Sequence, residues 1–228
     1  MNKKCCYNNR MEVLQQGNCT QKHMCDSLHE IFNALPRYTW DSISDIPFDS
    51  GVYIVFEKGE KYEDVDRIVR VGTHIGDGRL KKRLNCHFIN EKKDRSIFRK
   101  NVGKAMLNKD GDAYLEAWSL NRAKKENAAS IDRMKQAEIE KRVSEYMRSA
   151  FSFAVLEVED KDERLRLEEG IIATLNSCAK FGPGPEWNGL YSPEEKIRTS
   201  GMWLKQGLNG IPLSDKELLR IRELCSEQ

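Results

Sequence analysis

The sequence predicts an α+β fold, with a small central sheet of about three strands, mixed or antiparallel, flanked by helices. Three observations lead to this prediction. Two β-rich segments, GVYIVFE (51–57) and RIVRVG (67–72), lie close enough along the chain to pair as a hairpin. A third β-rich segment, FSFAVLEV (151–158), follows a long charged stretch with helical character. The other periodic segments have the 3.6-residue spacing of helices and outnumber the strands, which favours α+β over an all-β class.

The first predicted strand alternates along its length. It places Val52, Ile54 and Phe56 on one face and Tyr53 and Val55 on the other. Both faces are therefore expected to be covered. The polar segment KGEKYEDVD (58–66), which joins the two hairpin strands, is predicted to be a simple extended loop, because hairpins tolerate such insertions.

Helices are predicted in the rest of the chain. The first is DSLHEIFNALPRY, with Asp26 or Ser27 as N-cap and an end before Pro36. The others are expected at about 78–89, 96–107, 131–149, 162–177, 193–199 and 214–226, while 108–130 has no clear pattern. Asp160 or Asp162 lies near the start of the helix that begins near 162.

Three parts are expected along the chain: an N-terminal tail and helix (1–45), the sheet-bearing domain (46–191) and a C-terminal helical extension (192–228). The sequence has no apolar run of about 18 residues and no signal-peptide core at its start. We therefore expect a cytoplasmic protein without a membrane span.

The seven cysteines show no CxxC spacing and are expected to be reduced thiols. A cluster near the N-terminus raises an alternative, a zinc site, although its spacing fits no standard zinc pattern. Its members are Cys5, Cys6, Cys19, His23 and Cys25. The other interpretation is a loosely packed tail with incidental thiols.

Charge is unevenly distributed. The whole chain carries a net charge of only +2, so overall charge does not indicate nucleic-acid binding. Residues 79–104, however, hold ten lysines and arginines against two acids, a local charge of +8. Such a segment is either a solvated helical face or a phosphate-binding surface.

The stretch LKKRLNCHF (80–88) sharpens this question. Arg83 and His87 stand four residues apart, on one row of the predicted helix. Leu80, Leu84 and Phe88 are expected to attach this helix to the core. The row of Arg83 and His87 would then be free to bind a phosphate.

A carboxylate falls on the apolar side of the helix predicted at 162–177. Leu165, Leu167, Ile171, Ile172 and Leu175 form one arc, with Glu168 near its centre and Glu169 at its edge. A buried carboxylate is costly unless it is paired or binds a metal. Glu168 is thus either half of a buried salt bridge to an arginine or a ligand of Mg²⁺.

Four motifs, in this order, resemble those of the GIY-YIG nucleases. GVY (51–53) and RVG (70–72) resemble the two signatures, LKKRL (80–84) the arginine helix and LEEGII (167–172) the helix of the metal-binding glutamate. The resemblance covers roughly 48–190. It implies a GIY-YIG-like domain that hydrolyses phosphodiester bonds of DNA by direct attack of water. It also implies one Mg²⁺ or Mn²⁺ per site.

The resemblance assigns roles to four residues. Tyr53 would help to deprotonate the attacking water, although an ordinary phenol is a poor base at neutral pH without assistance. Arg83 would bind phosphate oxygens and stabilise charge in the transition state. His87 would bind phosphate or move protons. Glu168, preferred over Glu169, would be the metal ligand.

Further residues follow less directly from the resemblance. Lys81 and Lys82 are expected to contact the DNA backbone, His74 to line the site and Asn188 to match a later family asparagine. The second signature departs from the family pattern, because Arg70 stands where a tyrosine is usual. Arg70 would then hold phosphate, polarise the Tyr53 phenol, or pair with an acid in a site that has lost its activity.

Three hypotheses remain at this stage: a metal-dependent DNA endonuclease, a catalytically inactive GIY-YIG-fold module that binds nucleic acid, and an unrelated helical protein with a zinc-bound N-terminus. The biological role and the choice between DNA and RNA stay open. The segments 1–45 and 192–228 are open to extra DNA contacts or a homodimer interface.

Overall fold

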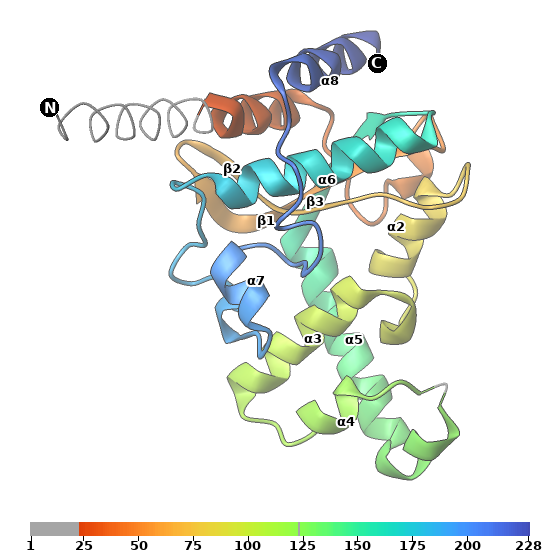
Figure 1. Ribbon diagram of the computed structural model, residues 1–228. Helices are drawn as coiled ribbons and strands as arrows, with labels where there is room; N and C mark the ends of the chain where they lie inside the picture. The colour runs from red at the N-terminus through yellow and green to blue at the C-terminus, as the bar shows by residue number, and fades with distance from the viewer. Residues whose placement is uncertain (1–22, 123) are drawn as a thin grey trace, which may run out of the picture.

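A three-stranded antiparallel sheet forms the centre of the computed structural model, which describes residues 23–122 and 124–228 (Figure 1). Its strands are β1 (Gly51–Tyr62), β2 (Val65–Gly72) and β3 (Phe151–Glu157), in the order β2-β1-β3. The predicted α+β class and the sheet of about three strands are confirmed, and the pairing is antiparallel throughout.

Helices account for most of the remaining described chain. They are residues 23–34, α2 (Leu80–Phe88), α3 (Ile97–Asp110), α4 (Leu115–Ser119), α5 (Arg133–Ala150), α6 (Lys161–Ser177), α7 (Glu195–Ser200) and α8 (Asp215–Glu227). Short 3₁₀ turns are η1 (Ile43–Asp45), η2 (Lys93–Arg95), η3 (Lys125–Ser130) and η4 (Asn188–Tyr191). Side chains accept N-cap hydrogen bonds at Ser96, Asp132, Asp160 and Ser214, which explains where α3, α5, α6 and α8 begin.

Two local predictions are wrong. Residues 23–34 are helical, so Asp26 and Ser27 lie inside the first helix instead of capping it. The hairpin connection is also much shorter than expected, because 58–62 and 65–66 continue the strands and leave a two-residue turn, in which Glu63 has φ 50°. Backbone pairing of Lys61 with Asp66 and burial of Tyr62 outweigh the polar composition of this segment.

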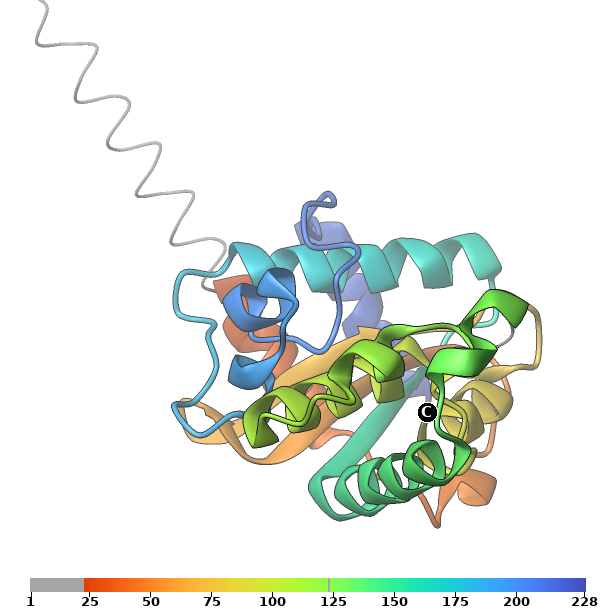
Figure 2. The same cartoon turned by 90° about the horizontal axis from the view of Figure 1, so that it is seen from below.

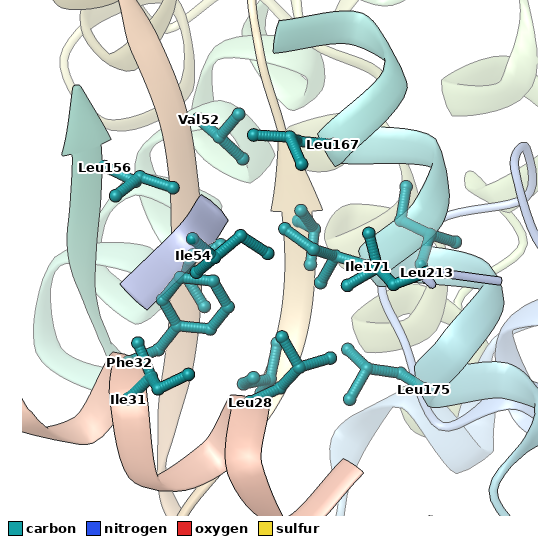
Figure 3. Close-up of a cluster of buried hydrophobic side chains, with 14 of the residues drawn as sticks. Leu28, Ile31, Phe32, Val52, Ile54, Leu156, Leu167, Ile171, Leu175 and Leu213 are labelled. Atoms are coloured by element: carbon teal, nitrogen blue, oxygen red, sulfur yellow. The ribbon is translucent and has the colours of Figure 1, made fainter. Parts of the chain in front are cut away.

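One face of the sheet packs against α6, α8 and the first helix. Val52, Ile54 and Leu156 of the sheet meet Leu167 and Ile171 of α6 (Figure 3). Leu28, Ile31 and Phe32 from the first helix close the same cluster (Figure 3). The face of β1 that the alternation assigns to Val52 and Ile54 is therefore buried.

The opposite face of the sheet packs against α2, α3 and α5. Figure 2 shows the sheet between the cyan helix α6 on one side and the green helices α3 and α5 on the other. Tyr53 and Val55 lie in this second cluster with Leu84, Phe98 and Val143. Each helix face that the sequence marked as apolar thus has a sheet face to cover.

The C-terminal segment takes part in both cores and also covers a sheet edge. β2 is an edge strand, and Trp203 donates a backbone hydrogen bond of 2.7 Å to the carbonyl of Val69. Leu218 and Ile221 of α8 are buried within the same chain. These contacts occupy the apolar face of α8, so a homodimer through this helix has no support in the structure. The division at 45/46 and 191/192 stays a prediction.

None of the described helices combines the length and apolarity needed to cross a membrane.

Candidate functional site

Gly72 leaves the space that the Tyr53 side chain occupies, and Gly51 leaves room for the backbone of the neighbouring strand. It pairs with Gly72 across the hairpin, and a Cβ built on Gly72 would lie 2.2 Å from the Tyr53 hydroxyl. A Cβ on Gly51 would lie 2.3 Å from the carbonyl oxygen of Leu156 in the other neighbouring strand. Glycine is needed at both positions for close approach, which gives the GVY and RVG motifs a steric reason.

The Tyr53 hydroxyl is tied to a buried hydrogen-bonded row. It lies 2.9 Å from Nε2 of His87, and Nδ1 of His87 lies 2.6 Å from Oγ of Ser96. Ser96 is also the N-cap of α3 and accepts from the Arg99 backbone N–H. Burial and the nearby arginines 70, 83 and 99 lower the pKa of His87 well below its usual range, so the ring is neutral. With its proton on Nδ1, His87 leaves Nε2 to accept from the phenol.

A cavity of about 530 Å³ lies beside Tyr53, and we call it the tyrosine cavity. Its wall is built from β1, β2, the loop after β2, α2, α3, α6 and the C-terminal segment. The lining residues are Tyr53, Arg70, Thr73, His74, Ile75, Gly76, Arg79, Lys82, Arg83, Cys86, Ile97, Leu165, Glu168 and Gln206. Four of these are Lys or Arg and one is acidic, so the cavity attracts anions.

Glu168 is the acid of the tyrosine cavity and is half-buried. Its Oε1 accepts a 3.1 Å hydrogen bond from the Thr73 backbone N–H, and its Oε2 has no hydrogen-bond partner in the described chain. Burial raises the pKa of Glu168, while Arg70, the Thr73 N–H and Arg83 oppose that shift. No arginine or lysine of the described residues forms a salt bridge with it within 4.0 Å. The buried salt bridge considered from the sequence is therefore not formed.

Arg70, the residue that departs from the family pattern, lies on the wall of the cavity. It is only 6% exposed, donates to the carbonyl of Trp203 and stacks over the ring of Phe98 at 5.0 Å. It makes no ion pair with an acid among the described residues, so the pairing expected for an inactivated site is not observed. Its charge instead faces Glu168 and His87.

Arg83 and His87, predicted to share one row, have different surroundings. Arg83 lines the tyrosine cavity and is partly exposed, with a single long hydrogen bond of 3.4 Å to the carbonyl of Arg95. His87 has no exposed surface and lies behind Tyr53 instead of on the wall. The structure therefore brings Arg83 to the cavity directly and connects His87 to it through the phenol.

His74 lines the same cavity, as expected, with both ring nitrogens engaged by backbone. Nε2 accepts from the Gly51 N–H at 3.2 Å, and Nδ1 donates to the Gly76 carbonyl at 2.5 Å. Burial lowers the pKa of His74. The side chain holds the loop after β2 against the start of β1, so its placement suits a positioning role more than a phosphate contact.

The remaining predicted ligands are spread out. Lys82 is exposed and lines the tyrosine cavity, whereas Lys81 points to Asp49, 3.3 Å away. Asn188 lies outside both this cavity and the row of Tyr53. It donates to the Tyr146 hydroxyl at 2.8 Å and accepts from Lys109 at 2.9 Å.

The basic residues of the segment 79–104 do not share one role. Lys93 and Arg99 are buried and paired, with Asp94 at 3.0 Å and Glu140 at 3.0 Å respectively. Arg79, Lys82 and Arg83 line the tyrosine cavity. The segment is therefore partly structural and partly a site wall, a distinction that residue type alone does not reveal.

Sequence reasoning missed three residues of the site. Ser96 fixes His87, Thr73 orients Glu168, and Gln206 lies on the wall. Ser96 carries a recognisable signal, since serine before an apolar helix is a typical N-cap. Thr73 acts through its backbone N–H and Gln206 arrives from a distant segment, so neither had a sequence signal.

The donor set at Glu168 fits a hard divalent ion and not a zinc cluster. Mg²⁺ is commonly held by one or two carboxylates, with waters and substrate oxygens completing its shell. The free Oε2 of Glu168 in an open cavity meets that requirement. No group of three potential metal ligands exists in the described part of the chain. Cys5, Cys6 and Cys19 of the zinc alternative lie outside the described residues, and Cys25 is buried in the core.

Comparison with known proteins identifies the family of this domain. No curated protein and no solved structure matches the chain. The profile of one protein family, described as GIY-YIG domain, matches residues 35–217. That match spans most of the chain and includes Tyr53, Arg70, Arg83 and Glu168, which places them within one family domain. The chain therefore belongs to the GIY-YIG family.

Proposed function

We propose that the protein is a divalent-metal-dependent endonuclease that hydrolyses phosphodiester bonds of DNA by direct attack of water. The family supports a nuclease-type function. The observation that carries the proposal is the meeting of Tyr53, Arg83 and Glu168 in one basic cavity of about 530 Å³. These residues come from β1, α2 and α6. Packing of a hydrophobic core does not require a tyrosine, an arginine and a glutamate to meet at one cavity.

Each side chain has a role in this proposal. Arg83 and Arg70 bind oxygens of the scissile phosphate and stabilise the charge that develops there. Tyr53 orients the attacking water and takes its proton while the phenol proton passes to Nε2 of His87, which also holds the phenol in place. Glu168 would hold one Mg²⁺ or Mn²⁺, which supplies Lewis-acid polarisation of the phosphate.

The alternative is a GIY-YIG module that binds nucleic acid without cutting it. Arg70 in the second signature is the observation that favours this alternative. Against it, Arg70 is unpaired with any described acid, and Glu168 keeps a free carboxylate oxygen. A carboxylate facing a phosphate weakens simple binding, because the two charges repel. It is useful once a cation lies between them.

The test is plasmid nicking with Mg²⁺, with Mn²⁺ and with chelator, using the wild type and two matched variants. Glu168→Gln removes the charge in the cavity, and Glu169→Gln removes that of its exposed neighbour. We expect metal-dependent nicking that falls by about 10²–10³-fold in Glu168→Gln and changes less than about twofold in Glu169→Gln. A wild type that shifts the plasmid in a gel but leaves it intact under all these conditions would favour the binding module.

A further inference from the structure

A second cavity, of about 510 Å³, lies next to the tyrosine cavity, and we call it the asparagine cavity. Arg70, Ile97, Glu168 and Gln206 line both spaces, so the two meet along a shared wall. The asparagine cavity adds Asn101 of α3 and the apolar side chains of Ile172 and Leu204. The mechanism proposed above makes no use of this space.

Asn101 is the unusual feature of this second cavity. Its side chain is 1% exposed, and neither Nδ2 nor Oδ1 has a hydrogen-bond partner in the described chain. Nε of Arg70, on the same wall, is also buried without a partner. Buried amides in folded proteins almost always find partners. Asn101 thus holds a donor and an acceptor at the wall of this cavity, both buried and without partners, which an occupant offering the complementary pair would satisfy.

Resting on the function proposed above, we propose that the asparagine cavity binds the nucleobase of the nucleotide next to the scissile phosphate. A carboxamide pairs side by side with a base edge, best with N6 and N7 of adenine. Ile172 and Leu204 provide apolar surface for the faces of a planar ring. A base held here must leave its stack, as in enzymes that extrude a nucleotide or act on unpaired strands.

The shared wall supports this choice of occupant. A phosphate held by Arg70 and Arg83 lies in the tyrosine cavity, and the sugar that follows it can cross the Arg70–Glu168 boundary. A phosphate and the base of the same nucleotide would then lie in adjoining cavities. A purely structural asparagine would instead be expected to bond to a backbone group nearby, as Asn108 on the same helix bonds to Tyr191 at 2.9 Å.

The experiment measures binding of the four 2′-deoxynucleoside 5′-monophosphates and of 2-deoxyribose 5-phosphate, which lacks a base. The full chain and the variants Asn101→Leu, Asn101→Asp and Asn108→Leu are titrated, with nitrogen–proton NMR spectra of the side-chain amides. Asn101→Leu and Asn101→Asp both assign the Asn101 signals by their loss. Asn108→Leu is the matched control, since Asn108 is exposed on the same helix.

We expect deoxyadenosine monophosphate to bind at least about tenfold more tightly than the base-free sugar phosphate and to shift the Asn101 amide signals. In Asn101→Leu this advantage should fall below about twofold, while Asn108→Leu should keep it. Equal binding of all five compounds by the wild type would overturn the proposal, and so would an Asn101 amide that does not respond and is satisfied by water only. If Asn101→Leu does not fold, the proposal is still tested by the affinities of the wild type for the five compounds and by the Asn101 amide signals, which Asn101→Asp assigns.

These readouts are independent of nicking. If the protein prefers deoxyadenosine monophosphate over the sugar phosphate but never nicks a plasmid, the base-binding proposal stands and the nuclease proposal fails. If it nicks plasmids and binds all five compounds alike, the nuclease proposal stands and the base-binding proposal fails.

Discussion

Two positions on the same face of β1 have polar groups in opposite surroundings. Tyr53 and Glu57 both point from β1 toward the α3–α5 side of the sheet. At Glu57 the carboxylate is 4% exposed and accepts from the indoles of Trp187 and Trp203, each at 2.7 Å, and from the Tyr146 hydroxyl. Near Tyr53, Glu168 accepts one backbone N–H and opens into a cavity.

The comparison teaches that a shifted pKa does not by itself mark a site. Burial raises the pKa of both Glu57 and Glu168. The two carboxylates differ in how many of their oxygens accept hydrogen bonds. Glu57 accepts from neutral donors on both oxygens, whereas Glu168 has one oxygen without a donor and arginines nearby. A closed set of donors stabilises the fold, and an open one is free to act on a ligand.

The largest effect should come from Glu57→Leu. This change leaves two indole N–H groups and one phenol O–H buried without an acceptor, so we expect the free energy of unfolding to fall by about 3–6 kcal/mol. Urea unfolding measures this loss, and Glu57→Gln, which keeps one carbonyl oxygen, is the control. A loss under about 1 kcal/mol would contradict the idea of a structural cluster around Glu57.

Tyr53→Phe changes the other of these two positions on β1. The nicking rate should fall by about 10²–10³-fold, because the group that accepts the proton of water is removed. Stability should change by only about 1 kcal/mol, since one buried hydrogen bond to His87 is lost. Nicking rates and urea unfolding of the same preparation separate the effect on catalysis from the effect on stability. A variant that cuts at wild-type rate would remove Tyr53 from the mechanism.

His87→Gln should have a smaller effect on catalysis. Because the ring touches Tyr53 and has no exposed surface, kcat should fall by about tenfold while KM stays constant. Steady-state nicking on a short duplex gives both constants. The opposite result, a raised KM at unchanged kcat, would support the direct phosphate contact that the sequence predicts for His87.

The smallest effect concerns pH. A carboxyl whose pKa is raised on folding contributes stability that is complete below its unfolded pKa and is lost as pH rises through the folded value. Stability of the wild type relative to Glu57→Gln should therefore fall as pH rises from about 4.5, the unfolded value for Glu57, and then level off. Urea unfolding between pH 5 and 8 measures this difference. A gap that does not change with pH would show that Glu57 titrates as in the unfolded chain.

Local patterns in the sequence predict the secondary structure well, and they place Tyr53, Arg83 and Glu168 on the elements that meet at the cavity. The alternation of β1 and the aspartate that caps α6, Asp160, are short-range signals, so both persist in the structure. Glu57 escaped notice because it directly precedes a polar segment, although it continues the face of Tyr53 and Val55. Its partners, Trp187 and Trp203, lie more than a hundred residues away.

Long-range contacts also explain the uncertainty over Arg70. Its single departure from the family pattern was open to three interpretations. In the structure, Arg70 donates to the carbonyl of Trp203, 133 residues later in the chain, and lies over the ring of Phe98. No pattern within a strand or helix encodes such a pairing, because it depends on where the C-terminal segment runs.

That late partner has a consequence for how the protein is made. The Tyr53 hairpin is synthesised first, whereas Trp203, whose carbonyl accepts from Arg70, follows 133 residues after Arg70, and Gln206 of the cavity wall follows Trp203. The cavity wall is therefore incomplete until this later segment has been made. Contacts this distant in sequence also form slowly during folding. A chain that ends before Trp203 would carry all four family motifs and still lack this part of the cavity wall.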